Sequence, residues 1–97
     1  MPDVSAVAEK KAAEMHNFNY FSHNSPRYGS PFDMLKREGI AYRAAGENIA
    51  KGQRTPQEVM TSWMNSPGHR QNILDSKFNQ IGVGYTNGVW VQMFVQR

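Results

Sequence analysis

The sequence feature that most constrains the fold is the pair of apolar segments on either side of Asn87-Gly88. Asn-Gly is favoured in two-residue hairpin turns of type I′, in which both residues adopt positive φ. Both flanking segments alternate in the manner of strands, so the sequence predicts an antiparallel hairpin. Its register pairs Tyr85 with Trp90, Val83 with Gln92 and Ile81 with Phe94 on one face, and Gly84 with Val91 and Gly82 with Met93 on the other.

Both faces of this predicted hairpin are largely apolar. An antiparallel sheet with one solvated face would instead alternate polar and apolar residues. We therefore expect an α/β fold, a three-layer α/β/α sandwich whose helices cover both faces of a small antiparallel sheet. Gly82 and Gly84 indicate that an element packs closely against one face. The 97 residues have room for one small domain, residues 1–97.

Helix starts in this sequence are marked by Ser or Thr followed by Pro, which suit the N-cap and the first helical position. Asp33 and Glu58 lie three residues after the first two of these caps and predict capping boxes. Gly39 predicts a left-handed cap that ends the first helix. The predicted helices begin at Ser30-Pro31, Thr55-Pro56 and Ser66-Pro67.

A further amphipathic helix is predicted over residues 3–17, where apolar side chains recur every three or four positions. Lys10, Lys11 and Glu14 are expected on its solvent-facing side. Residues 40–50 favour a short strand or extended segment. Glu47 lies there among small apolar residues, which favours its burial, and a buried carboxylate requires a partner.

Charge and cysteine content exclude several classes of function. The net charge is +3, from 11 basic and 8 acidic residues, and the basic residues are scattered. This pattern lacks the basic stripe of a nucleic-acid-binding protein. The absence of cysteine excludes disulfides and thiol catalysis. No apolar run approaches membrane-spanning length. The start has no signal-peptide pattern, which favours a cytoplasmic protein or a segment trimmed from a longer secreted one.

His23, Glu47 and His69 form the candidate site, and only the fold can bring them together. His69 is expected in the first turn of the helix after Ser66-Pro67, where the helix dipole keeps its imidazole neutral. Two imidazoles and a carboxylate are suitable zinc ligands. Alternatively, Glu47 fixes the tautomer of a histidine. Each of the three could also have a purely local role, as a surface-loop histidine or as partners of nearby backbone groups.

Ser66 lies three residues before His69, which raises the possibility of a Ser-His pair. Because Ser66 is expected to cap the helix, and no acid is evidently placed to orient His69, we do not predict a nucleophilic serine here.

Four motifs in order resemble the bacterial, cysteine-free branch of the CAP/SCP superfamily, which includes cysteine-rich secretory proteins, antigen 5 and pathogenesis-related proteins. The resemblance covers nearly the whole chain, from about residue 6 to residue 94. The motifs are YFSHNSP at 20–26, GENIA at 46–50, WMNSPGHR at 63–70 and IGVGY at 81–85.

The resemblance implies an α/β/α sandwich with a cleft of two histidines and two glutamates, which binds zinc or another divalent ion in several relatives. His23 and His69 match the two histidines, and Glu47 matches one glutamate. Asn65 and Ser66 occupy the place of the second glutamate, so the tetrad is incomplete. Either residue could substitute through a hydrogen bond or a water. No catalytic residue is carried over.

The resemblance also implies a bacterial protein that is extracellular or at the cell envelope or spore surface. Relatives usually begin with another helix before residues 3–17, and this chain is expected to lack it. The surface so exposed would favour a homodimer or another partner. We rank three functions: a binding module for a small-molecule, lipid or peptide ligand, then a structural interaction module, then a metal-assisted hydrolase or protease with Glu47 as base.

Overall fold

The protein is an α/β/α sandwich, as the sequence predicts. The computed structural model describes residues 2–97, so Met1 lies outside the description. The elements in chain order are α1 (Pro2–Asn17), α2 (Pro31–Arg37), β1 (Ala44–Lys51), α3 (Pro56–Met64), α4 (Pro67–Leu74), β2 (Gln80–Thr86) and β3 (Val89–Gln96).

The three strands form one antiparallel sheet in the order β1-β3-β2. The predicted hairpin register is confirmed, since Tyr85 pairs with Trp90 and Gly84 with Val91. Asn87 has φ 44° in the turn between these strands, as the Asn-Gly signal requires. The segment that precedes α3 adds β1 to the other side of β3, with Glu47 opposite Met93.

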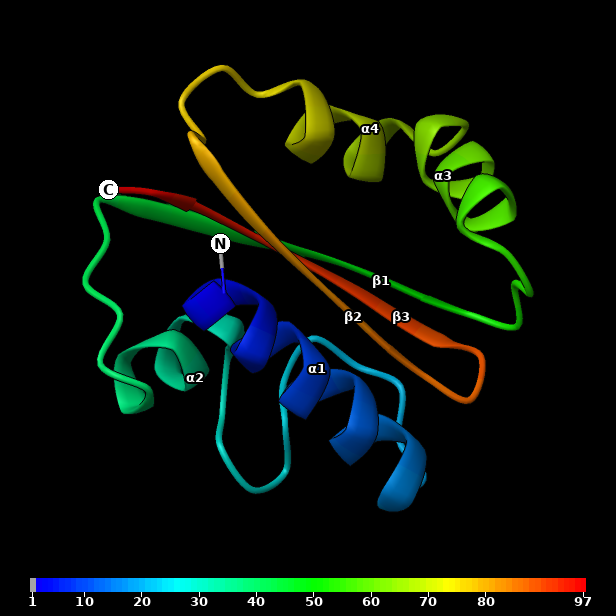
Figure 1. The fold of residues 1–97 in the computed structure, drawn as a ribbon, viewed down its shortest axis with the longest axis horizontal. Helices are drawn as coiled ribbons and strands as arrows, with labels where there is room; N and C mark the ends of the chain where they lie inside the picture. Colours follow the sequence, from blue (N-terminus) through cyan, green and yellow to red (C-terminus); the bar gives the residue numbers. More distant parts are fainter. Residues whose placement is uncertain (1) are drawn as a thin grey trace.

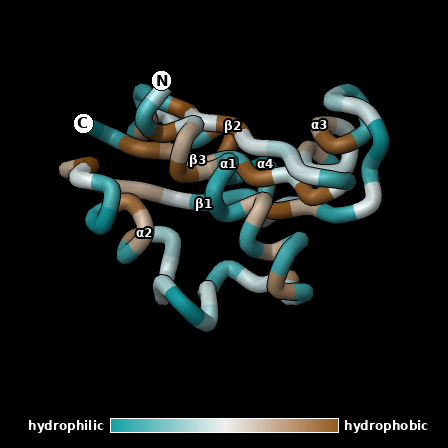
Figure 2. Tube along the Cα trace, turned by 60° about the horizontal axis from the view of Figure 1, so that its bottom comes forward, coloured by the Kyte–Doolittle hydropathy of each residue, from teal (hydrophilic) through white to brown (hydrophobic). Residues whose placement is uncertain are grey.

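Helices cover both faces of the sheet, α1 and α2 on one and α3 and α4 on the other (Figure 1). Helix α1 lies directly on Gly82 and Gly84, where a Cβ atom would come within 2.3–2.4 Å of the helix backbone. On the other face, the Trp63 indole donates to the Ile49 carbonyl at 3.1 Å and fastens α3 to β1. Figure 2 shows the strongly hydrophobic residues mainly within the strands and helices, with hydrophilic residues frequent in the connections.

The second face of the sheet is covered less completely than predicted. Ile81, Val83 and Tyr85 on β2 are 41–50% exposed, although Trp90 and Phe94 on the neighbouring strand are buried. Helices α3 and α4 contact β1 and leave this row of β2 open. In the part of the chain that the structure describes, no helix combines the length and apolar character needed to cross a membrane.

Three helix caps show how far local sequence signals hold. Ser30 and Asp33 form the predicted capping box at α2. Thr55 caps α3 through the Glu58 amide, but the Glu58 carboxylate accepts from Arg54 rather than from Thr55. Ser66 is the N-cap residue of α4 and Pro67 follows it, as predicted, but the Ser66 side chain makes no cap hydrogen bond and contacts a neighbouring histidine instead.

The prediction that Lys11 and Glu14 face solvent on α1 was also wrong. Lys11 is fully buried and Glu14 is 5% exposed, whereas Lys10 is exposed as predicted. The physical reason is that both buried side chains find polar partners in the loop that follows α1 and on β1, described below. Position 11 also falls on the helix's own apolar stripe, between Val7 and Met15, which is the sequence signal for its burial.

Candidate functional site

The loop between α1 and α2 places His23 against Glu47 of β1. His23 Nδ1 is 2.7 Å from Glu47 Oε1, and the exposed fractions of the two side chains are 55% and 1%. An ionised carboxylate only accepts hydrogen bonds, so in the neutral ring the proton is on Nδ1. Nε2 then carries no proton, and its lone pair is free. Glu47 therefore fixes the His23 tautomer in which Nε2 can act as a metal ligand or a base.

The buried Lys11 of α1 contacts both members of this pair. Its ammonium donates to the His23 carbonyl oxygen and lies 3.4 Å from Glu47 Oε2. Burial lowers the pKa of Lys11, and the neighbouring charges of Glu47 and Glu14 act in the opposite direction. Lys11 thus neutralises the buried carboxylate and also holds the backbone of the histidine loop. Sequence reasoning missed this residue.

A second buried carboxylate, Glu14, ties the same loop to α1. The Tyr20 hydroxyl donates to Glu14 Oε1 at 2.5 Å, and the Ser25 hydroxyl donates to the same oxygen. Burial and then this hydrogen bond raise the pKa of Tyr20. Ser25 Oγ in turn accepts from the Arg27 and Tyr28 amides and shapes the turn. The loop is therefore held to Glu14 on both sides of His23.

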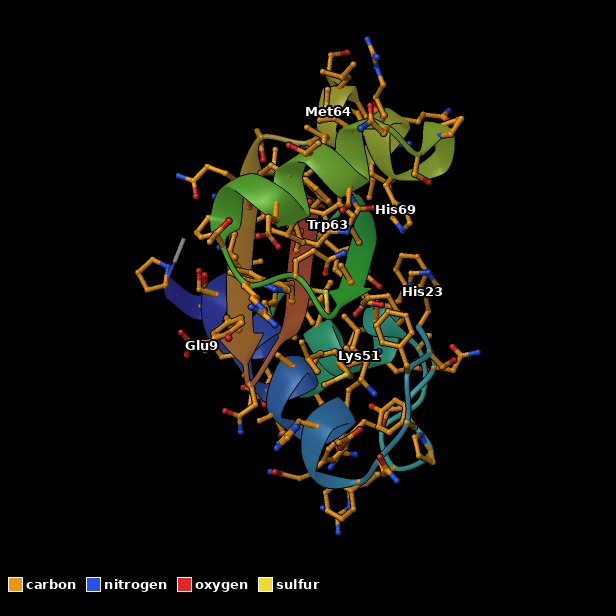
Figure 3. The ribbon with its side chains drawn as sticks, turned by 90° about the vertical axis from the view of Figure 1, so that its right-hand side faces the viewer. Glu9, His23, Lys51, Trp63, Met64 and His69 are labelled. Carbon is orange, nitrogen blue, oxygen red and sulfur yellow. The ribbon has the colours of Figure 1, made fainter. Side chains whose placement is uncertain are left out.

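His69 lies in the first turn of α4, as predicted. Its Nδ1 is 2.9 Å from Ser66 Oγ, so Ser66 orients the ring. Burial, and secondarily the charge of His23, lower the pKa of His69, which favours the neutral ring near pH 7. Figure 3 shows His23 and His69 on the same side of the molecule, presented by different elements. Asn65 is exposed at the end of α3 and its side chain makes no hydrogen bond with residues 2–97.

A network of buried amides fixes α4 to the sheet. Asn48 is fully buried, and its Nδ2 donates to the His69 carbonyl and to Gln92 Oε1, both at 3.1 Å. Asn72 Nδ2 donates to Asn48 Oδ1 at 2.9 Å and to the Glu47 carbonyl at 3.4 Å. The strand that carries Glu47 thereby also sets the position of His69.

The fold thus forms two pairs, His23 with Glu47 and His69 with Ser66, and Asn65 belongs to neither. Within residues 2–97, no three or more His, Asp or Glu side chains form a group that could hold a metal ion. Glu47 is already shared by His23 and Lys11. Among residues 2–97, these side chains therefore do not supply the ligands of a closed structural zinc site.

The structure combines a sheet that has helices on both faces with a buried carboxylate paired to a loop histidine. The model of the CAP family, the cysteine-rich secretory protein family, matches residues 2–94. The chain is a member of the CAP family.

Similar proteins are found among bacteria. The Bacillus subtilis protein YkwD is 56% identical over 94 residues, covering 95% of this chain and 37% of YkwD. An extracellular SCP-domain protein from Bacillus anthracis matches with a TM-score of 0.96 and 36% identity, over 98% of this chain and 32% of that one. An outer surface protein from Borrelia burgdorferi shares the fold, with a TM-score of 0.88 and 20% identity, over 100% of this chain and 75% of that one. The chain thus spans about a third of the two Bacillus proteins.

Proposed function

We propose that this domain is a non-enzymatic binding module whose cleft holds a divalent cation between His23 and His69. The observation that carries the proposal is the 2.7 Å contact between His23 Nδ1 and Glu47 Oε1. This contact leaves the second ring nitrogen to a ligand, and a buried carboxylate behind a histidine is the usual support of a protein metal ligand. Ser66 gives His69 a comparable orientation, through the contact to its Nδ1.

The proposal extends to location and ligand. Solved relatives are described as an extracellular protein and an outer surface protein, which supports a place outside the bacterial cell for this domain. The cation would help to bind a small molecule, lipid or peptide. The homodimer expected from the sequence stays a prediction.

Zinc is expected to raise the melting temperature of the wild type and to leave that of a His23→Ala/His69→Ala variant unchanged. Zinc at ten times its Kd adds about 1.4 kcal/mol of stability, or roughly 6–10 °C for a domain of this size. The measurement is thermal unfolding followed by circular dichroism with zinc and with EDTA. His16→Ala is the matched control, since His16 is exposed and contacts Asn87 instead of the cleft. Equal shifts in the melting temperature of the wild type and of the double variant would contradict a metal site at these histidines.

The geometry favours binding over hydrolysis with Glu47 as the general base. The Glu47 side chain is 1% exposed, and one of its oxygens already pairs with His23, so a substrate in the cleft meets the imidazole first. A general base must come within hydrogen-bond distance of the proton that it removes. For a purely structural module, Glu47→Gln would lower stability, and zinc would shift the wild type and the histidine variants alike.

A further inference from the structure

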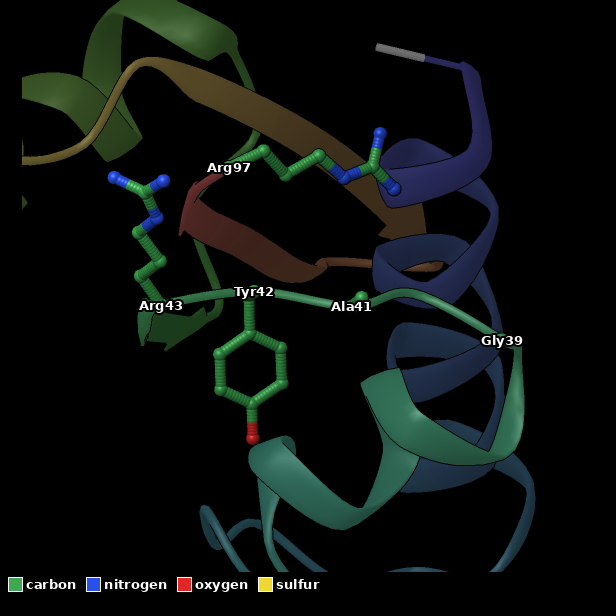
Figure 4. A pocket seen from close by; sticks show the side chains of 5 residues that line it. All are labelled: Gly39, Ala41, Tyr42, Arg43 and Arg97. Atoms are coloured by element: carbon green, nitrogen blue, oxygen red, sulfur yellow. The ribbon is translucent and has the colours of Figure 1, made fainter.

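We propose a second binding site, for a small organic anion, at the end of the sheet where β1 begins and β3 ends. A cavity of about 520 Å³ opens there, lined by Gly39, Ala41, Tyr42, Arg43 and Arg97 (Figure 4). Its lining residues include none of His23, Glu47 and His69. Two arginines contribute the charged groups of its lining. Their proximity is not visible in the sequence, where they are far apart.

The sheet brings the backbones of the two arginines close to each other. Ala44 pairs with Gln96, and the Arg43 amide donates to the Gln96 carbonyl at 2.8 Å. Arg97 follows directly, and its backbone is held by Asn79 through two contacts of 3.2 Å. The Arg97 side chain extends toward α1, whereas the Arg43 side chain extends away from it (Figure 4). The backbone thus fixes both arginines at one edge of the cavity.

The two guanidinium groups differ in what they already bind. Arg97 Nη2 is 2.5 Å from Asp3 Oδ2, and this contact lowers the pKa of Asp3. The side chain of Arg43 makes no hydrogen bond or ion pair with any of residues 2–97, so all of its donors are available to a ligand. A guanidinium binds a carboxylate or phosphate through two parallel hydrogen bonds. The Arg97 guanidinium is therefore oriented by Asp3, and the Arg43 guanidinium is available to a ligand.

The size and walls of the cavity indicate an organic anion rather than a bare ion. A volume of about 520 Å³ lies within the range of small-molecule sites. Ala41 supplies apolar surface, while the Tyr42 ring extends away from both guanidinium groups (Figure 4) and its hydroxyl is directed to the Phe32 carbonyl at 3.4 Å. Lys36 lies 6.0 Å from the Tyr42 ring centre and adds positive charge nearby. The ligand class is a small molecule that carries a phosphate or carboxylate group beside an apolar or aromatic part.

The test is a titration of the ¹⁵N-labelled protein with phenyl phosphate, followed by amide chemical shifts. We expect saturable shifts confined to residues 39–43 and the two strand ends. Arg43→Gln should weaken binding about tenfold or more, because a charge-assisted pair of hydrogen bonds is lost. Arg43→Lys keeps the charge without the planar fork and should give an intermediate affinity. Arg54→Gln is the control, since Arg54 is exposed and its side chain is outside the cavity lining.

Further arms identify the recognised group and exclude an effect of the chain end. Benzoate tests the carboxylate, inorganic phosphate tests the ion without its aromatic part, and a protein extended by Gly-Ser beyond Arg97 moves the terminal carboxylate away. Saturation by either organic anion, lost in Arg43→Gln, supports the site. Affinity that is unchanged in Arg43→Gln, tighter binding of inorganic phosphate than of both organic anions, or no saturation by any probe overturns it.

Discussion

A Gly84→Ala variant is expected to lose about 3 kcal/mol or more of folding stability, at the upper end of what overpacking costs. A Cβ atom at Gly84 would lie 2.4 Å from the backbone of Ala8 and Glu9, far inside van der Waals contact. These are backbone atoms of α1, which cannot rotate away as a flexible side chain would. The whole helix must move off the sheet, and it carries Val4, Val7 and Ala8 of the core with it.

The measurement is urea unfolding of Gly84→Ala beside a Gly68→Ala control. A Cβ atom at Gly68, in the first turn of α4, would meet nothing within 4 Å. Alanine is also the better helix former, so this control should be neutral or gain up to about 1 kcal/mol. A loss below about 1 kcal/mol in Gly84→Ala would mean that α1 is not seated on β2 as described.

The fold could be predicted because its main signals are local. Asn87-Gly88 fixes the turn, the turn fixes the register, and the register places Gly82 and Gly84 together on one face. Because both faces of these two strands are apolar, helices are expected to cover both faces, which predicts the three layers. The open row at Ile81, Val83 and Tyr85 could not be foreseen in this way, because coverage of one strand depends on where separate helices come to rest.

The candidate site was predictable only in the residues that stand out by type, one of which is buried. His23, Glu47 and His69 stand out by residue type, and the structure places Glu47 against His23. The side chain of Ser66 was misjudged because an N-cap hydroxyl near a histidine has two competing partners, and sequence does not rank them. Lys11 was missed for a related reason, since a charged residue on an apolar stripe is buried only if distant segments supply its partners.

A Lys11→Met variant is expected to lose about 3–5 kcal/mol of stability, the usual cost of removing one partner of a buried ion pair. Methionine fills much of the same space, so the loss would come from charge rather than from a cavity. Glu47 would then lie buried without the ammonium group that pairs with it, Glu14 would lose a nearby positive charge, and the His23 carbonyl would lose its donor. Lys10→Met is the control, because Lys10 pairs with Glu38 where both side chains are 42% exposed. Exposed pairs of this kind contribute about 1 kcal/mol at most.

The double variant Lys11→Met/Glu47→Gln separates charge from packing. If Glu47 is destabilising once Lys11 is gone, neutralising it should restore part of the lost stability, and the double-mutant cycle should give a coupling of about 1–3 kcal/mol. The measurement is urea unfolding of the wild type, both single variants and the double variant at pH 7. Additive losses, or equal losses in Lys10→Met and Lys11→Met, would contradict an ion pair beneath the histidine. Strong coupling would show that α1, the histidine loop and β1 are held together through one buried charge.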